Sequence, residues 1–288
     1  MQGSERPTQP GGVERRGSTA LDGRPVVTHW YGPAGRRLAH VATGVGQRVG
    51  AQPALAIVLL VGVIIAFTAS FLVSRVYDAV VENDGVAMLD RPMLQEAMQL
   101  RRPWLDDFSA GIAYVFGPVG MPLIAVAAIL LLALTRRSWT PVILVAGAGV
   151  GSLLMTIAGK DIIGRSRPPL VDAVPPYEHS PSFPSGHSLN ATVVAGVVGY
   201  LLWLHRHAIL AKIACVVVPV VLAVVVGLTR VLLGAHWFTD VLAAWLLGAG
   251  WLAVVVTAHR LYLTARERGA PEAPQPRAAV ESHGSHRP

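Results

Sequence analysis

The chain has 288 residues, of which 52% are hydrophobic and only 14% are charged. Soluble domains carry about a quarter charged residues, so a chain this poor in charge, with its apolar residues in long runs, is expected to be a polytopic membrane protein. The formal net charge of +7 does not indicate nucleic-acid binding, because no basic, aromatic-interleaved soluble domain is present to supply it. The single cysteine, Cys215, excludes disulfides within the chain and cysteine-rich metal sites.

The N-terminal segment differs from the rest of the chain. Residues 1–50 are rich in Gly, Pro, Arg and Thr without sustained periodicity, which predicts a disordered tail. No signal peptide is apparent, because the first apolar run begins only near Pro53. That run, residues 54–73, holds no charge and has the roughly 20 residues that a bilayer span needs. A second disordered tail is predicted for residues 264–288, so the membrane domain is expected over residues 51–263.

Residues 78–107 mix apolar and charged side chains at about helical spacing. This pattern predicts a short amphipathic helix on the outer membrane surface, and an ordinary packed helix within a loop is an equally good interpretation. The second expected span, residues 109–135, holds Gly117-Pro118 and Pro122 in its first half, which predicts a kink near the outer surface. Further apolar spans are expected at residues 140–158, 189–204, 213–228 and 241–257. The predicted fold is therefore all-α, with about six transmembrane helices.

The distribution of basic residues predicts the topology. With about six spans, both termini fall on one side of the membrane, together with the basic loops after the second and fourth spans. The positive-inside rule places that side in the cytoplasm. The outer side then receives residues 78–107, 160–185 and 230–240, whose cations we assign to chemistry at an extracytoplasmic site. A composition rich in Ala, Val, Gly and Arg, with few lysines, indicates the plasma membrane of a bacterium with a GC-rich genome.

The stretch Thr229 to Asp240 places polar residues between two apolar runs. On a helix, His236 and Asp240 would share one face because they are four residues apart. A carboxylate bonded to one imidazole nitrogen fixes the tautomer and leaves the other nitrogen free to attack or to accept a proton. Arg230 lies just upstream, with a guanidinium suited to phosphate oxygens. The combination predicts chemistry on a phosphate, although a His-Asp pair at this spacing also occurs in structural roles.

Two further motifs fall on the same predicted side, residues 160–168 (KDIIGRSRP) and residues 184–187 (PSGH). With residues 229–240 they resemble the three motifs of the type 2 phosphatidic acid phosphatase (PAP2) superfamily: Lys-x6-Arg-Pro, Pro-Ser-Gly-His and Ser-Arg-x5-His-x3-Asp. The departure is Thr229 at the serine position, where a hydroxyl is kept. The resemblance covers about residues 50–260, and three ordered motifs with fixed internal spacing are highly specific.

The resemblance implies a role for each matched residue. His236 would be the nucleophile that forms a phosphohistidine intermediate, with Asp240 orienting its ring. His187 would be the general acid that protonates the leaving group and later activates water. The phosphoryl oxygens would be bound by the remaining signature residues, Lys160, Arg167, Ser185, Gly186 and Arg230. No metal or cofactor is expected, because three cations balance the charge and no carboxylate cluster suits magnesium.

Other residues near the motifs receive structural interpretations. Arg165 lies within the first motif but outside its signature, so we rank it below the others. Loop roles are assigned by default to Asp161, Glu178 and His179. Considered singly, Lys160 and Arg167 also fit interfacial anchors, and Asp240 fits a charge at a helix N-terminus.

An outward site in the membrane implies a lipid phosphate or diphosphate as substrate. Undecaprenyl diphosphate, phosphatidylglycerophosphate and phosphatidic acid all fit this expectation. A lipid phosphotransferase would use the same intermediate with an alcohol in place of water. From another class, a lipid-binding membrane protein could keep the fold without turnover, although it would not need both histidines and the aspartate. Vanadium haloperoxidases share the motifs but are soluble.

Overall fold

The computed structural model describes residues 51–268, and the predicted tail at residues 1–50 and most of that at residues 264–288 lie outside this range. The described residues form helices and no strand, as expected. The helices are α2 (Ala51–Glu82), η1 (Gly85–Leu89), α3 (Asp90–Leu100), α4 (Pro103–Val115), α5 (Gly120–Arg136), α6 (Thr140–Ile163), η2 (Leu170–Asp172), α7 (Gly186–Trp203), α8 (Ile209–Leu232) and α9 (Phe238–Arg268).

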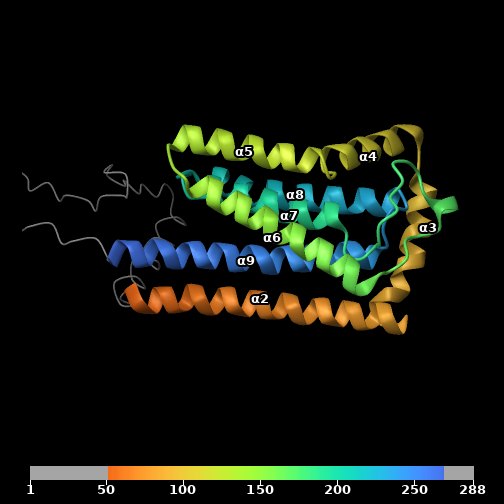
Figure 1. Cartoon of the computed structure of the whole chain (residues 1–288), viewed down its shortest axis with the longest axis horizontal. Helices are drawn as coiled ribbons and strands as arrows, with labels where there is room; N and C mark the ends of the chain where they lie inside the picture. The colour runs from red at the N-terminus through yellow and green to blue at the C-terminus, as the bar shows by residue number, and fades with distance from the viewer. Residues whose placement is uncertain (1–50, 269–288) are drawn as a thin grey trace, which may run out of the picture. The chain divides into compact units, whose positions relative to one another are not determined.

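The long helices lie side by side and alternate in direction (Figure 1). Helix α7 is central, because it packs against α6, α8 and α9. Its residues Val193 and Val197 are fully buried in a core that also includes Val145 of α6 and Val226 of α8. The alternation brings the C-terminal ends of α6 and α8 to the same end of the bundle as the N-terminal ends of α7 and α9. All three sequence motifs begin or end there.

Within residues 51–268, four helices, α2, α6, α8 and α9, are long and apolar enough to cross a membrane, and α4 with α5 makes a fifth candidate bent by 58°. The bend confirms the kink predicted at Gly117-Pro118. The bend requires glycine at position 120, because a Cβ there would lie 2.1 Å from the Val115 carbonyl oxygen. The fourth expected span, residues 189–204, corresponds to α7, which has 18 residues and is not among these apolar helices.

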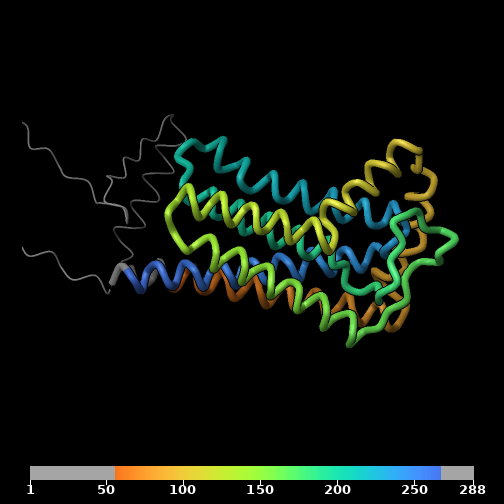
Figure 2. Tube along the Cα trace, turned by 45° about the horizontal axis from the view of Figure 1, so that its top comes forward, coloured from red at the N-terminus to blue at the C-terminus, as the bar shows by residue number. Residues whose placement is uncertain are grey.

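The predicted amphipathic helix corresponds to α3, which lies across one end of the bundle near the 164–185 loop (Figures 1 and 2). Its Ala97 packs with Val231 and Val241, so α3 is held against the ends of α8 and α9. At its C-terminal end the Arg101 guanidinium donates to the carbonyl oxygens of Leu232 and Asp172, both at 2.8 Å. These contacts join α3, α8 and the loop into one cap over the motif residues.

Candidate active site

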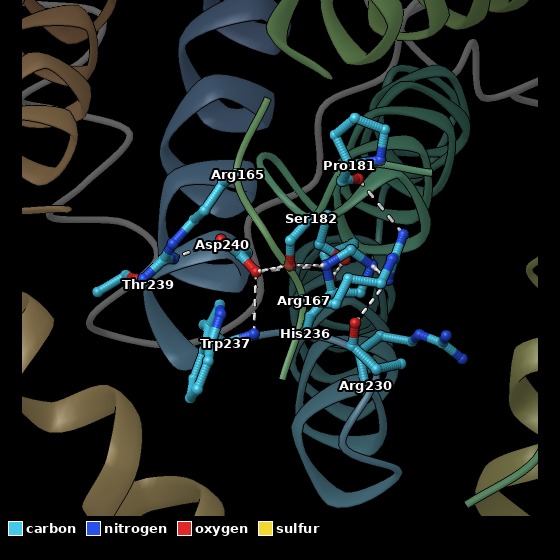
Figure 3. A network of polar contacts seen from close by, with 12 residues as sticks. Arg165, Arg167, Pro181, Ser182, Arg230, His236, Trp237, Thr239 and Asp240 are labelled. Atoms are coloured by element: carbon cyan, nitrogen blue, oxygen red, sulfur yellow. Dashed lines mark hydrogen bonds and ion pairs between the residues drawn. The ribbon is translucent and has the colours of Figure 1, made fainter. Parts of the chain in front are cut away.

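The prediction that His236 and Asp240 lie on one helix is wrong. Helix α8 ends at Leu232 and α9 begins at Phe238, so His236 lies in the connecting turn. The chain reverses at Gly234, whose φ of 67° is a conformation that favours glycine. The two side chains still meet, because His236 Nδ1 lies 3.5 Å from Asp240 Oδ2. The turn and the first turn of α9 therefore build the pair that the spacing suggested (Figure 3).

The Asp240 carboxylate is fully buried and accepts hydrogen bonds at both oxygens. Oδ1 pairs with Arg165 Nη1 at 2.6 Å, and Oδ2 accepts from the Trp237 backbone N–H at 2.9 Å. The Ser182 hydroxyl also donates to Oδ2 and lies 3.4 Å from His236 Nδ1. These contacts fix the carboxylate beside one nitrogen of the His236 ring. Ser182 was missed from the sequence because it precedes the PSGH motif by two residues.

The other nitrogen of His236 faces a cationic region. Its Nε2 lies 3.2 Å from Arg167 Nη1 and 3.8 Å from Glu178 Oε2. Arg167 is held in place by the backbone, because it donates to the carbonyl oxygens of Ala235 at 2.5 Å and Ser180 at 2.7 Å. Burial lowers the pKa of Arg167. The ring therefore has Nδ1 toward a carboxylate and Nε2 toward the site, which is the arrangement of an oriented nucleophile or base.

Glu178, which was expected to have only a loop role, lies in the centre of the motif residues. Its Oε2 pairs with Arg167 Nη2 at 2.8 Å, and its Oε1 pairs with Arg230 Nη2 and lies 3.5 Å from His187 Nδ1. Burial alone would raise the pKa of this carboxyl, but contact with His236 and the positive charge of Arg230 hold it well below its ordinary value. The motif residues thus surround an anionic group.

Arg230 is fully buried at the end of α8. Its Nε and Nη1 groups have no hydrogen-bond partner within the described part of the chain. Buried guanidinium donors are costly to leave unpaired, so this side chain has donors available for a further anionic oxygen. The neighbouring Thr229 hydroxyl donates to the Val226 carbonyl oxygen at 2.8 Å. The hydroxyl at the serine position of the motif is therefore bonded within α8.

His187 is oriented by the break between α4 and α5. Its Nε2 lies 3.2 Å from the Ala113 carbonyl oxygen. That oxygen lacks its usual helical donor, because the Gly117 N–H bonds to the Tyr114 carbonyl instead. A Cβ on Gly117 would lie 3.3 Å from His187 Nε2. The kink thus supplies both an acceptor and room for the ring, and it leaves Nδ1 directed at Glu178.

The other predicted phosphate ligands border the site without touching Glu178. Lys160 Nζ donates to Ser180 Oγ at 2.9 Å and to the Pro181 carbonyl oxygen. The Ser185 hydroxyl is fully buried and lies 2.9 Å from Ser188 Oγ, so it faces its own helix. Gly186 begins α7, where a Cβ would lie 2.9 Å from Thr156 Cγ2. Of the five predicted ligands, Arg167 and Arg230 contact the central anion.

Arg165 joins the site to helix α3. Its second guanidinium nitrogen pairs with Asp90 Oδ2 at 2.6 Å. Asp90 also accepts from the Thr239 backbone N–H at 2.8 Å and from its hydroxyl at 2.7 Å. One arginine therefore bridges two buried carboxylates, Asp90 and Asp240. From the sequence, Arg165 was a weaker candidate for the site than the signature residues. Its position within the first motif was the one signal that could have identified it.

The fold and the site define a helical membrane protein that holds an anion between two histidines. The profile of the PAP2 superfamily matches residues 139–262. Phosphatidylglycerophosphatase B of Bacillus subtilis (strain 168) is 33% identical over 184 residues, which are 62% of this chain and 87% of that protein. The crystal structure of a transmembrane PAP2 type phosphatidylglycerolphosphate phosphatase from Bacillus subtilis matches with a TM-score of 0.58 and 27% identity, covering 72% of this chain and 96% of that one.

This chain belongs to the PAP2 superfamily, in its membrane-bound lipid phosphatase branch. It is therefore a multi-pass membrane phosphatase, as the three motifs implied.

Proposed function

We propose that the chain hydrolyses the phosphate monoester of a lipid, with phosphatidylglycerophosphate as the leading substrate, through a phosphohistidine intermediate at the extracytoplasmic face. The relative's activity supports this choice of substrate over undecaprenyl diphosphate. The observation that carries the proposal is the position of Glu178. Its two carboxylate oxygens contact Arg167 and Arg230 between His187 and His236, as two oxygens of a phosphoryl group would.

The first step follows from the orientation of His236. Asp240 holds the Nδ1 side of the ring, so Nε2 attacks phosphorus and the bond from phosphorus to the lipid oxygen breaks. Arg167 and Arg230 bind the phosphoryl oxygens as charge develops. Protonated His187, held through its Nε2–H by the Ala113 carbonyl, gives its Nδ1 proton to the leaving alkoxide. The products of this step are the lipid alcohol and phosphorylated His236.

The second step uses the same residues in reverse. Neutral His187 takes a proton at Nδ1 from a water molecule, whose oxygen attacks the phosphorus of the phosphohistidine. The bond from phosphorus to His236 Nε2 breaks and inorganic phosphate leaves. A lipid alcohol in place of water would give the phosphotransferase reaction, which product analysis with an added acceptor lipid distinguishes.

Phosphate release by the purified protein tests the proposal. We expect release from phosphatidylglycerophosphate to exceed that from phosphatidic acid and undecaprenyl diphosphate. We also expect it to be unchanged by EDTA, because guanidinium groups of this chain bind the phosphoryl oxygens. Activity that EDTA removes and magnesium restores would contradict the mechanism. No release from any of the three lipids would contradict the proposed substrate class.

A cysteine at position 171 tests the side of the membrane. Val171 is 90% exposed in the loop that carries η2, so Val171→Cys in a Cys215→Ala background is expected to react with an impermeant maleimide in intact cells. The matched control is His207→Cys, in the exposed loop at the other end of the bundle, which is expected to react only after lysis. The reverse pattern would place the site in the cytoplasm.

Glu178→Gln is expected to strengthen inhibition by inorganic phosphate at least about five-fold, which corresponds to ~1 kcal/mol, because phosphate no longer competes with the Glu178 carboxylate for Arg167 and Arg230. The lowered pKa of Glu178 means that its ion pairs are complete above the ordinary carboxyl pKa of about 4.3 and are lost only at lower pH. The difference from the unaltered protein is therefore expected to stay constant above about pH 5. The measurement is the inhibition constant of phosphate against pH. Weaker inhibition in the variant would show that Glu178 supports anion binding.

A further inference from the structure

An apolar cavity lies between α7, α8 and α9, outside the cluster of motif residues. Its volume is about 640 Å³ and its lining is almost entirely apolar, within the size range of ligand pockets. The wall on α8 includes Val216 and Val220, each 56% exposed. In a membrane these side chains face hydrocarbon, so the cavity is a groove that lipid can enter from the side.

The groove is long enough for one lipid acyl chain. Along α7 its lining extends from Thr192 to Trp203, a rise of about 16 Å at 1.5 Å per residue. Half of a bilayer's hydrocarbon core is about 15 Å thick. Trp203 lies at the opposite end of α7 from His187, roughly 24 Å away by the same rise. Along α9 the lining extends from Trp245, close after Asp240, to Arg260, so the groove runs from near the phosphatase site to the remote end of the bundle, where Trp203 and Arg260 lie.

The remote end of the groove is basic and aromatic. Arg260, which lines it, lies 5.9 Å from the ring centroid of Tyr200 and 5.7 Å from that of Trp203. Lys212 lies 5.1 Å from the Trp203 ring. Neither cation forms an ion pair with a carboxylate among residues that the structure describes. Tyrosine and tryptophan are the side chains typical of the headgroup level.

We propose that this groove binds an anionic glycerophospholipid of the leaflet opposite the phosphatase site. One acyl chain lies along α7 and α8, and the headgroup phosphate lies at Arg260 and Lys212. Charge complementarity at the basic end of an apolar groove supports this occupant. It is independent of the proposed substrate, because the two cations lie at the ends of helices remote from the catalytic histidines.

Photocrosslinking in proteoliposomes tests the site. The probes are phosphatidylglycerol and phosphatidylcholine that carry the same diazirine on one acyl chain, each at a low fraction in phosphatidylcholine vesicles. Labelled peptides are mapped by mass spectrometry. We expect labelling of residues 215–224 by the phosphatidylglycerol probe to exceed labelling by the phosphatidylcholine probe. The expected excess is about five-fold for each basic residue engaged.

Three variants separate the groove from general lipid contact. Arg260→Gln with Lys212→Gln is expected to reduce phosphatidylglycerol labelling to the phosphatidylcholine level. Arg136→Gln with Arg137→Gln removes two charges at the same end of the bundle, outside the groove, and is expected to leave labelling unchanged. Ala249→Trp, which fills the groove from α9, is expected to reduce labelling by both probes.

All variants are expected to keep phosphate release in phosphatidylcholine vesicles, which shows that they fold. Equal labelling by the two probes would overturn the proposal. So would an equal loss of labelling in the Arg260/Lys212 variant and in the Arg136/Arg137 variant.

Discussion

His236→Ala is expected to lower phosphate release by about 10⁴-fold or more, the scale of loss when a covalent nucleophile is removed. The reason is geometric. His236 Nε2 faces Arg167 and Glu178, while Nδ1 faces Asp240. His187, the imidazole on the other side of Glu178, has a backbone carbonyl at its second nitrogen in place of a carboxylate. The measurement is the initial rate with the preferred lipid, together with acid-labile labelling of the protein by substrate carrying a radioactive phosphate. The label is expected in the unaltered protein and absent from the variant.

Two controls make this result specific. His236→Gln keeps most of the side-chain volume in a fully buried position and is expected to lose the same activity, which separates chemistry from packing. His207→Ala, an exposed histidine in the loop before α8, is expected to retain full turnover. Turnover within tenfold of the unaltered rate in either His236 variant would rule out the phosphohistidine mechanism.

Arg165→Met is expected to destabilise the protein by about 3–5 kcal/mol, because it leaves two buried carboxylates without their shared cation. The carboxylates are Asp90, with 5% of its side chain exposed, and Asp240, with none exposed. For a domain of this size the expected fall in Tm is roughly 6–20 °C. Phosphate release is expected to fall as well, because the carboxylate that orients His236 loses a partner. Thermal unfolding in detergent measures the first effect.

The matched control is Arg75→Met, which breaks an ion pair on α2 whose partners are 66% and 46% exposed. Exposed pairs contribute about 0–1 kcal/mol, so its Tm is expected to change little. Adding Asp90→Asn to Arg165→Met removes one unpaired charge and is expected to recover part of the lost stability. Equal effects of Arg165→Met and Arg75→Met would show that the Arg165 bridge is not a structural centre of the site.

The fold class and the helix positions could be predicted because apolar runs of bilayer length are a strong signal. The run at residues 54–73 corresponds to α2, and the predicted kink at Gly117-Pro118 corresponds to the break between α4 and α5. Helix lengths were harder to predict, since helices continue past the apolar run into polar sequence. Helix α7 shows where apolar length stops being a guide. It packs against α6, α8 and α9, so it needs little surface that faces lipid.

Much of the site was also predictable, because its residues follow fixed spacings within each motif. The geometry of the His236–Asp240 pair was not, since the four-residue spacing suggested one helix and the structure places His236 in a turn. The role of Gly117 was hidden for a related reason. A kink can be predicted from glycine and proline, but the His187 ring that fills the space beside it comes from a segment 70 residues later.

By itself, the sequence determined the membrane class, the order of the helices and the phosphatase motifs with His187, Arg230, His236 and Asp240. These depend on composition and local spacing, which the chain carries directly. Only the tertiary structure decided that Glu178 lies between the two arginines and that Arg165 bridges Asp90 and Asp240. A carboxylate in a loop and an arginine in a motif become partners only when packing brings distant segments together. Their charges then require pairing because the site is buried.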